Sequence, residues 1–380
     1  MKKIKSIYVI LVVAFLLRLI FLFPQYSGDV KNHLVWGNAA LTNTIGLYST
    51  HFTGFNDANY PPLAIYLFAV SNLFLSLLRN LFTFLNNSFS FFPSFIIPLF
   101  NHENMSYGFL KLPGILADLG TGLLIFKFFQ ARKIKHPYLL TSLYLFNPAV
   151  IYLSSVWGQI EPITNFFLLL SLYLMFLGKT DRAKSSSLIF FIFATLTKQT
   201  ALWFAPFYLF LWLKNLPVRQ LLAGAFYSIL VFFASYLPFG LSPFAALKNY
   251  FATLSGSSTG VSDAAWNFWY LLYPAGAEDS VHLGLLSVRT ISIVLLISLL
   301  VYLLIRVSKN QYPRTFLNSL FIWALAVFFL QTRVHERHLA PALIFGLLTF
   351  AENPAWWVGY VTLSLFHFLN LFLTLKIPFI

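Results

Sequence analysis

Apolar residues lie along this chain in long runs separated by short polar segments. A helix needs about 20 mostly apolar residues to cross the hydrocarbon core of a bilayer, and many of these runs approach that length. The pattern predicts an all-α polytopic membrane protein of about 11–13 spans, which forms one integral domain over residues 1–380. The runs occupy approximately 7–24, 61–79, 81–100, 107–129, 138–153, 162–178, 186–197, 200–213, 221–238, 288–306, 315–330, 339–350 and 355–374.

The composition strengthens this prediction. Hydrophobic residues make up 59% of the 380 residues and charged residues only 9%, which is far from the composition of a soluble domain. The formal net charge is +14, but the basic residues form short runs between apolar segments and not one patch that would predict nucleic-acid binding. The chain has no cysteine, so disulfides and thiol chemistry are excluded.

The basic residues instead predict topology. If the first run is a retained span with a cytoplasmic N-terminus, alternate loops contain the Lys and Arg clusters, as the positive-inside rule requires. These clusters are Arg132-Lys133-Lys135, Lys179-Arg182-Lys184, Lys214-Arg219 and Arg306-Lys309-Arg314. Nearly all segments with chemically capable side chains then fall on the opposite, outer face.

Two runs, 186–197 and 200–213, are each too short to span a bilayer. One long helix through both would bury Lys198 at mid-membrane, so we expect two half-height helices that meet at Lys198 and leave a water-accessible cavity. Two polar stretches, 25–60 and 241–287, are too long for simple connections. We expect the first to be a long outer loop that bears interfacial helices.

The first outer loop contains Asp29, His33 and Trp36. If Asn32–Leu41 is helical, His33 and Trp36 lie one turn apart on one face, and His33 follows Asp29 by one turn. A carboxylate, an imidazole and an indole would then border one cavity mouth, which suits a general base beside a ring-stacking wall. The alternative is that Asp29 is a solvated helix cap.

A second segment combines aromatic, amide and carboxylate side chains in Trp157, Gln159 and Glu161. Proteins hold sugar hydroxyls with such groups, so we expect this segment to bind a saccharide. Asp118 lies inside an apolar run, where an acid is by default functional or paired with Arg or Lys. We expect it to be paired.

The most concentrated polar segment contains Arg333, His335, Glu336, Arg337 and His338. Its second histidine comes three residues after the first, whereas the zinc-protease motif needs a spacing of four, so that motif is excluded. Two Arg and two His around one carboxylate predict an anion site for a phosphate, to which Lys198 adds a point charge. The alternative is a charged loop that only anchors the end of a span.

These segments, in this order and on one side, resemble the GT-C superfamily of integral-membrane glycosyltransferases. Within it the chain is most similar to bacterial and archaeal relatives of the second GPI mannosyltransferase, and more loosely to the dolichyl-phosphate-glucose glucosyltransferases. The resemblance rests on Asp29, Tyr60-Pro61-Pro62-Leu63, Asn147-Pro148, Trp157-Gly158-Gln159, Lys198-Gln199, Asn267-Phe268-Trp269 and His335-Glu336-Arg337.

The resemblance implies a GT-C-like fold and an inverting transfer of a monosaccharide, mannose or another hexose. The donor would be a polyprenyl-phosphate sugar, and the acceptor a hydroxyl of a lipid-linked glycan, lipid or other molecule on the extracytoplasmic face of a prokaryotic plasma membrane. Asp29 carries over as the catalytic base, and no metal ion or other cofactor is implied. Val30 follows Asp29 where the family often has a second acid, and the nearest candidate is Asp57.

The expected site has two further groups of residues. The residues expected to bind the donor phosphate, and to stabilise charge on the leaving lipid phosphate, are Lys198, Arg333, His335, Arg337 and His338. The residues expected to bind the sugar or the acceptor are His33, Trp36, Asp57, Tyr60, Trp157, Gln159, Glu161, Gln199, Asn267 and Glu336. The expected partners are the sugar donor, the acceptor and membrane lipid, without nucleic acid.

Two other functions stay open. A lipid-linked-saccharide flippase or polysaccharide polymerase could share these loops, but its ionisable residues would usually be distributed through the membrane depth. Here the ionisable groups stay in the loops, apart from Arg18, Lys111, Asp118 and Arg289. The third possibility is a non-enzymatic membrane scaffold, against which the half-height helices and the anion site argue.

Overall fold

Helices dominate the structure, a computed structural model that describes residues 2–24, 27–254, 258–274, 276–309, 313–351 and 356–375. The all-α prediction is confirmed. The α-helices are α1 (Lys2–Leu19), α2 (Gly28–Thr42), α3 (Pro62–Ser88), α4 (Ile96–Asn101), α5 (Glu103–Ala131), α6 (Pro137–Leu145), α7 (Pro148–Ile151), α8 (Glu161–Leu177), α9 (Asp181–Thr197), α10 (Ala205–Asn215), α11 (Val218–Tyr236), α12 (Pro243–Leu254), α13 (Phe268–Leu272), α14 (Val288–Lys309), α15 (Arg314–Leu330), α16 (Ala340–Phe350) and α17 (Trp357–Thr374). The shorter elements are η1 (Leu47–Ser49), the π-helix η2 (Tyr152–Trp157), η3 (Gln199–Phe204), η4 (Leu237–Phe239), η5 (Glu336–Leu339) and the antiparallel hairpin of β1 (His282–Leu283) and β2 (Leu286–Ser287).

Several of these helices have the length and composition of membrane spans, which supports an integral membrane protein. In the described part of the chain, five helices qualify, namely Pro62–Ser88, Glu103–Ala131, Val218–Phe239, Val288–Lys309 and Trp357–Thr374. The pair Pro137–Leu145 and Pro148–Trp157, bent by 43°, makes six if it is one span. This number is below the expected 11–13 because other apolar helices, such as Glu161–Leu177, are shorter than the length of about 20 residues that crosses a bilayer.

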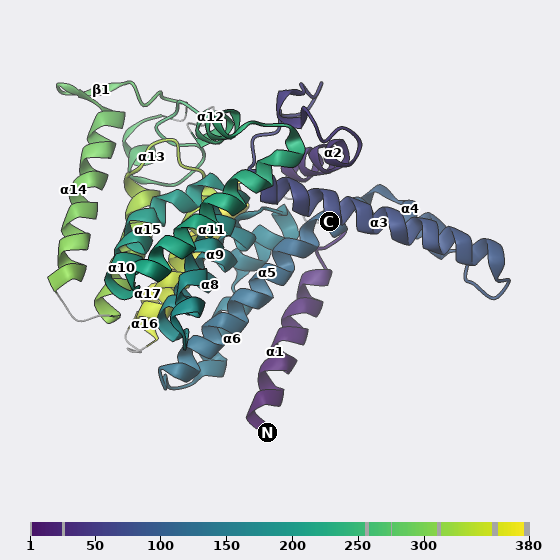
Figure 1. The fold of residues 1–380 in the computed structure, drawn as a ribbon, viewed down its shortest axis with the longest axis horizontal. Coiled ribbons are helices and arrows are strands. Elements are labelled where there is room, and N and C mark those ends of the chain that lie inside the picture. Colours follow the sequence, from purple (N-terminus) through teal and green to yellow (C-terminus); the bar gives the residue numbers. More distant parts are fainter. Residues whose placement is uncertain are drawn as a thin grey trace.

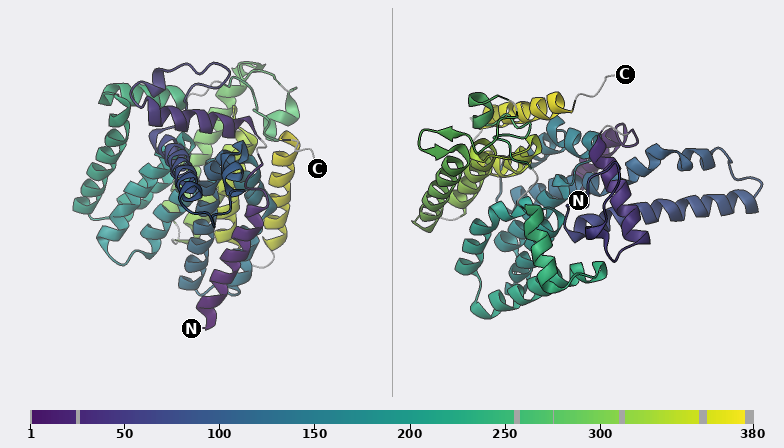
Figure 2. Two further views of the ribbon diagram at one scale, coloured as in Figure 1. Left: turned by 90° about the vertical axis from the view of Figure 1, so that its right-hand side faces the viewer. Right: turned by 90° about the horizontal axis from the view of Figure 1, so that it is seen from above.

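The two spans expected at 61–79 and 81–100 are not separate helices. α3 runs without a break from Pro62 to Ser88, and the short α4 then leads into α5. Figures 1 and 2 show α3 extending sideways from the other helices, with α4 running beside it. A proline in the first turn starts α3, because that position needs no backbone N–H donor.

α2 packs against the first half of α3. Gly37 allows the close approach, since a Cβ at this position would lie 2.8 Å from the carbonyl carbon of Phe68. Asn72 of α3 then donates to Leu34 O at 3.1 Å and to Asn38 Oδ1 at 2.9 Å. This packing fixes the helix that carries Asp29 in its first turn.

A buried ion pair ties α1 to α5. The side chain of Arg18 is fully buried, and its Nη2 lies 3.5 Å from Oδ2 of Asp118. Arg18 Nη1 also donates to Ala14 O and Leu145 O, and the Tyr144 hydroxyl donates to Asp118 Oδ1. The expectation that Asp118 is paired is confirmed.

Lys198 breaks the helical segment between 181 and 215, as expected. It is extended, with φ −152° and ψ 133°, and separates α9 from η3 and α10. α9 is longer than the expected run 186–197, whereas α10 is shorter than the expected run 200–213. α9 has 17 residues because it begins before the expected start, where Thr180 caps it by accepting a hydrogen bond from Ala183 N at 3.1 Å.

The elements have two distinct ends. In Figure 1, α2, α12, α13 and β1 lie at the top, and we call this the α2 end. The N-terminus and the C-terminal end of α14 lie at the bottom. Arg306 and Lys309 are in the last turn of α14, so at least one predicted basic cluster lies away from the α2 end.

We expect the Arg18–Asp118 pair to be essential for stability. Asp118→Ala leaves the Arg18 charge buried without its counter-ion, which should lower the free energy of unfolding by about 3–5 kcal/mol. Replacing both residues together, by Arg18→Met with Asp118→Leu, should recover most of this loss. Unfolding in detergent, followed by tryptophan fluorescence, measures both effects. An Asp118→Ala protein as stable as the parent would show that the pair contributes little.

Candidate functional site

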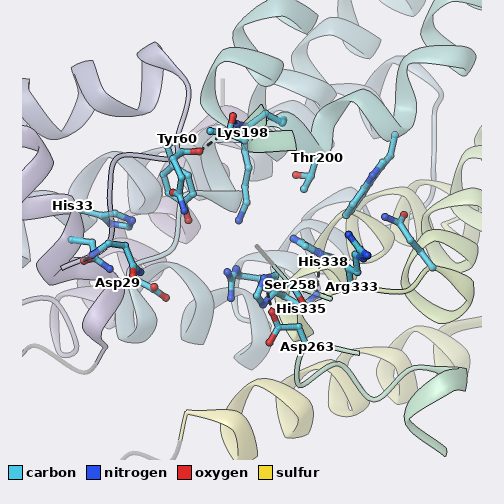
Figure 3. A pocket seen from close by; sticks show the side chains of 18 of the residues that line it. Asp29, His33, Tyr60, Lys198, Thr200, Ser258, Asp263, Arg333, His335 and His338 are labelled. Atoms are coloured by element: carbon cyan, nitrogen blue, oxygen red, sulfur yellow. Dashed lines mark hydrogen bonds and ion pairs between the residues drawn. The ribbon is translucent and has the colours of Figure 1, made fainter. Parts of the chain in front are cut away.

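A polar cavity of about 360 Å³ lies at the α2 end. Of the residues predicted from the sequence, it is lined by Asp29, His33, Trp36, Tyr60, Lys198, Gln199, Arg333, His335, Arg337 and His338. Figure 3 shows Asp29 and His33 on one side, with Arg333, His335 and Asp263 on another. The cavity therefore joins the first polar segment of the chain to the last.

Other lining residues were not selected from the sequence. They are Asn32, Asn56, Asn59, Thr200, Trp203, Thr253, Ser258, Asp263 and Gln331. Trp203 lies within an apolar run, and its ring meets His338 edge-on with 4.9 Å between centroids. Trp203 reaches the cavity because the helix breaks at Lys198, a few residues earlier. The sequence signal that could have identified Trp203 is therefore its position just after a predicted helix break.

Some predicted residues lie outside the cavity lining. Asp57 is exposed and pairs with His51, whose Nδ1 lies 3.0 Å from Asp57 Oδ1. Asn267 caps α13 and donates to Gln331 O at 3.1 Å. The remaining residues of this kind, which support the lining residues from behind, are Trp157, Gln159, Glu161 and Glu336.

Asp29 is held by the last residue of the π-helix and by the segment that follows it. Trp157 Nε1 donates to Asp29 Oδ2 at 3.1 Å, and Gln159 Nε2 donates to the same oxygen. Gly158 lies between these donors with φ +76°, a conformation that glycine adopts without strain. Burial alone raises the pKa of Asp29, but Arg337, His33 and the two hydrogen bonds outweigh it, so this pKa is lowered.

His33 lies one turn after Asp29 inside an aromatic group. Its ring stacks on Phe68 with 4.2 Å between centroids and lies 5.6 Å from the ring of Tyr60 and 5.9 Å from that of Trp36. Burial lowers the pKa of His33 to about 4, so the imidazole is neutral near pH 7. The predicted alignment of His33 and Trp36 on one helical face is confirmed.

Lys198 and Arg337 meet at one buried carboxylate. Glu161, at the start of α8, is 4% exposed. Its Oε1 accepts from Lys198 Nζ and lies 3.1 Å from Arg337 Nε. Lys198 Nζ also lies 5.4 Å from the centre of the Tyr60 ring. The two cations come from the α9–η3 break and from η5, and Glu161 fixes them at the same cavity.

Arg337 has a second acidic partner. Its Nη1 donates to Glu336 Oε1 at 2.9 Å. Burial disfavours a charged guanidinium, but Glu336 and Glu161 outweigh this effect and raise the pKa of Arg337. Burial likewise lowers the pKa of Lys198, against the pull of Glu161.

Arg333 is bound by an acid from a distant loop. Its Nε and Nη2 donate to the two oxygens of Asp279 at 2.7 Å and 3.1 Å. Thr332 Oγ1 also donates to Asp279 Oδ2 at 3.0 Å. Because Nε and Nη2 of Arg333 already donate to Asp279, fewer of its N–H groups are free to bind a ligand than we expected.

The expected anion site therefore needs a correction. We expected cations around one carboxylate, Glu336. The structure adds three more, which are Glu161, Asp279 and Asp263. An isolated buried charge is costly, and the cations of this cavity avoid that cost because each pairs with an acid from a distant part of the chain. Among the residues that the structure describes, no group of three or more His, Asp or Glu side chains is arranged to hold a metal ion.

Comparison of the chain with models of known protein families finds no match, and comparison with curated proteins finds none either. The functional interpretation therefore rests on the cavity itself.

The neutral state of His33 predicts a loss of stability in acid. Its ordinary pKa is 6.5 and burial lowers it to about 4 in the folded protein. Between these values the unfolded chain binds a proton that the folded chain does not, so the free energy of unfolding should fall as pH falls, by about 1.4 kcal/mol per pH unit from this residue. Above pH 6.5 the residue should have no such effect.

The measurement is the unfolding midpoint of the parent and of His33→Phe at several pH values between 7 and 4. His33→Phe should show a shallower dependence on pH, because the titrating ring is gone. His51→Phe, which removes an exposed histidine outside the aromatic group of His33, is the matched control. Equal slopes for all three proteins would contradict a neutral buried His33.

Proposed function

We propose that this chain is an inverting hexosyltransferase of the GT-C superfamily in a prokaryotic plasma membrane. It would move a hexose from a polyprenyl-phosphate donor to a hydroxyl of a glycan or lipid acceptor on the extracytoplasmic face. The observation that supports this most is one cavity lined both by an ionised carboxylate, Asp29, and by two cations, Lys198 and Arg337, that both pair with the buried Glu161. Displacement of a lipid phosphate by a hydroxyl requires a base and a group that stabilises the phosphate.

Asp29 has the geometry of a base. Both of its hydrogen bonds, from Trp157 and Gln159, go to Oδ2. The other oxygen, Oδ1, is therefore the one that accepts the proton of the acceptor hydroxyl. The hydroxyl oxygen then bonds to the anomeric carbon, and the bond from that carbon to the phosphate oxygen breaks on the opposite side.

Lys198 and Arg337 stabilise the leaving group in this reaction. The phosphate oxygen takes the electron pair of the broken bond, so the lipid phosphate leaves with one additional negative charge. Cations that are already fixed by Glu161 need little rearrangement as this charge develops. The rings of Tyr60 and Trp203, which also line the cavity, supply apolar surfaces for a sugar ring.

The position of the cavity favours transfer over transport. A flippase would need a path through the membrane to the side of the predicted basic clusters, whereas this cavity joins Asp29 to the loop of Arg333 and His338. A transfer reaction needs the base and the phosphate-binding cations to reach the same substrates, and one shared cavity meets this need.

The direct test is sugar transfer by Asp29→Asn. The substitution keeps the shape of the side chain but removes the base, so turnover should fall by about 100-fold or more, while the donor still binds. Membranes that contain the protein are incubated with polyprenyl-phosphate mannose or glucose and a panel of glycan and lipid acceptors, and the products are analysed. The control is Asp181→Asn, an exposed acid at the start of α9. Turnover close to that of the parent would exclude Asp29 as the base.

The proposed orientation is tested by cysteine labelling, because the parent chain has no cysteine. Asp57, whose side chain is 63% exposed, lies in the loop that follows α2. In intact cells Asp57→Cys should react with a membrane-impermeant thiol reagent, whereas the exposed Lys179→Cys, between α8 and α9, should react only after the cells are opened. The reverse pattern would place the cavity on the cytoplasmic face.

A further inference from the structure

The cavity has a second carboxylate that the proposed mechanism does not use. Asp263 lines the cavity, and its side chain is 41% exposed. In Figure 3 it lies beside His335 and across the cavity from Asp29. The second acid that we expected near Asp29 was Asp57, which is not among the residues that line the cavity. A carboxylate that lines the same cavity as Arg333 and Arg337 would repel a phosphate bound there, so its presence needs another explanation.

His335 holds this carboxylate through a defined tautomer. The His335 ring accepts a hydrogen bond from the backbone N–H of His338, and its Nε2 lies 3.2 Å from Asp263 Oδ2. A neutral imidazole has one N–H, so the nitrogen that accepts from His338 is Nδ1 and the proton is on Nε2. Nε2–H therefore donates to Asp263. Both ring nitrogens are thus engaged within the protein, so we assign His335 a different role from the phosphate contact that we expected.

The backbone around Asp263 is also fixed. Asp263 N donates to Val334 O at 2.9 Å, which joins the two loops directly. Asn370 of α17 donates to Ala264 O at 2.9 Å and accepts from Trp266 N at 3.1 Å. Ala264 has φ +60°, an uncommon value for a residue with a side chain. Such strain persists only where the surroundings impose it, and here these bonds hold Asp263 at the cavity wall.

We propose that Asp263 binds hydroxyl groups of the transferred sugar and that His335 is its positioning residue. The inference rests on the proposed function and names a subsite for the donor. An ionised carboxylate only accepts hydrogen bonds, and sugar hydroxyls are donors that it binds without repulsion. Figure 3 places Asp263 on the side of Arg333 and His335, across the cavity from Asp29, so we assign it to the donor sugar and not to the acceptor hydroxyl that Asp29 deprotonates.

The test compares binding of two lipids to the purified full chain in nanodiscs, polyprenyl phosphate and polyprenyl-phosphate hexose, the latter as mannose and as glucose. Asp263→Ala should weaken binding of the hexose lipid by about 10- to 100-fold, the effect of losing hydrogen bonds to a charged acceptor. Binding of polyprenyl phosphate should stay unchanged. Lys198→Gln is the matched contrast and should weaken binding of both lipids, because its target is the phosphate.

The role of His335 is tested by two substitutions. His335→Phe fills the space without an N–H and should reproduce the selective loss seen with Asp263→Ala. His335→Gln keeps a donor for Asp263 and should restore a large part of hexose-lipid binding. A merely structural role of His335 predicts equal loss for both lipids and no difference between Phe and Gln.

The outcomes separate the two proposals. If the parent binds neither lipid, the proposed function fails and this inference falls with it. If the parent binds both lipids and Asp263→Ala binds the hexose lipid as tightly as the parent does, the hydroxyl subsite is wrong while the proposed function stands. An equal loss of both lipids in Asp263→Ala would also overturn the subsite.

Discussion

The buried carboxylate of Glu161 is the group on which the arrangement of the cavity depends. It holds Lys198 and Arg337, which come from separate parts of the chain, at one point. Each of the three charges is costly to bury alone, and removing one partner of such a group costs far more than the group contributes as a whole. The ion pairs of Glu161 therefore fix the relative positions of these residues more than they stabilise the fold. They make one relative placement of α8, the α9–η3 break and η5 favourable.

The same constraint explains why the cavity lies where helices end. Backbone groups inside a continuous helix are already paired, so unpaired backbone groups that could face a cavity occur at breaks and termini. α8 begins at Glu161, α9 ends before Lys198, and the π-helix ends before Gly158. An acid in the first turn of α8 is also favoured by the partial positive charge of the helix N-terminus.

Local spacing in the sequence predicted the parts of the site that depend on a few neighbouring residues. The placement of His33 and Trp36 on one face of a helix, the break at Lys198 and the pairing of Asp118 followed from periodicity, span length and the cost of a buried charge. The fold as α-helical followed from the apolar runs. These features need no knowledge of distant contacts.

Features that depend on distant parts of the chain were missed or misjudged. Asp263 and Asp279 come from a long polar stretch whose own pattern gives no sign that it reaches the loop of Arg333 and His335. The apolar pattern of 61–100 was interpreted as two spans, because one long helix followed by the short α4 has the same apolar composition as two spans. We expected Glu161 to contact a ligand, but it is buried and pairs with Lys198 and Arg337. The residues around Glu161 in the sequence do not indicate these distant partners.

In the proposed reaction the charges of the cavity move without changing in sum. Asp29 loses its negative charge when it takes the acceptor proton, and the lipid phosphate gains one when the glycosidic bond breaks. Arg337 acts electrostatically on Asp29 and is itself fixed by Glu161 and Glu336. Because the negative charge moves from Asp29 to the phosphate near cations that are already in place, the net charge of the cavity stays constant. Fixed dipoles and ions also need no reorganisation as the bond breaks. The buried acids that pair with the cations thus allow them to remain charged and immobile at the position where the phosphate charge develops.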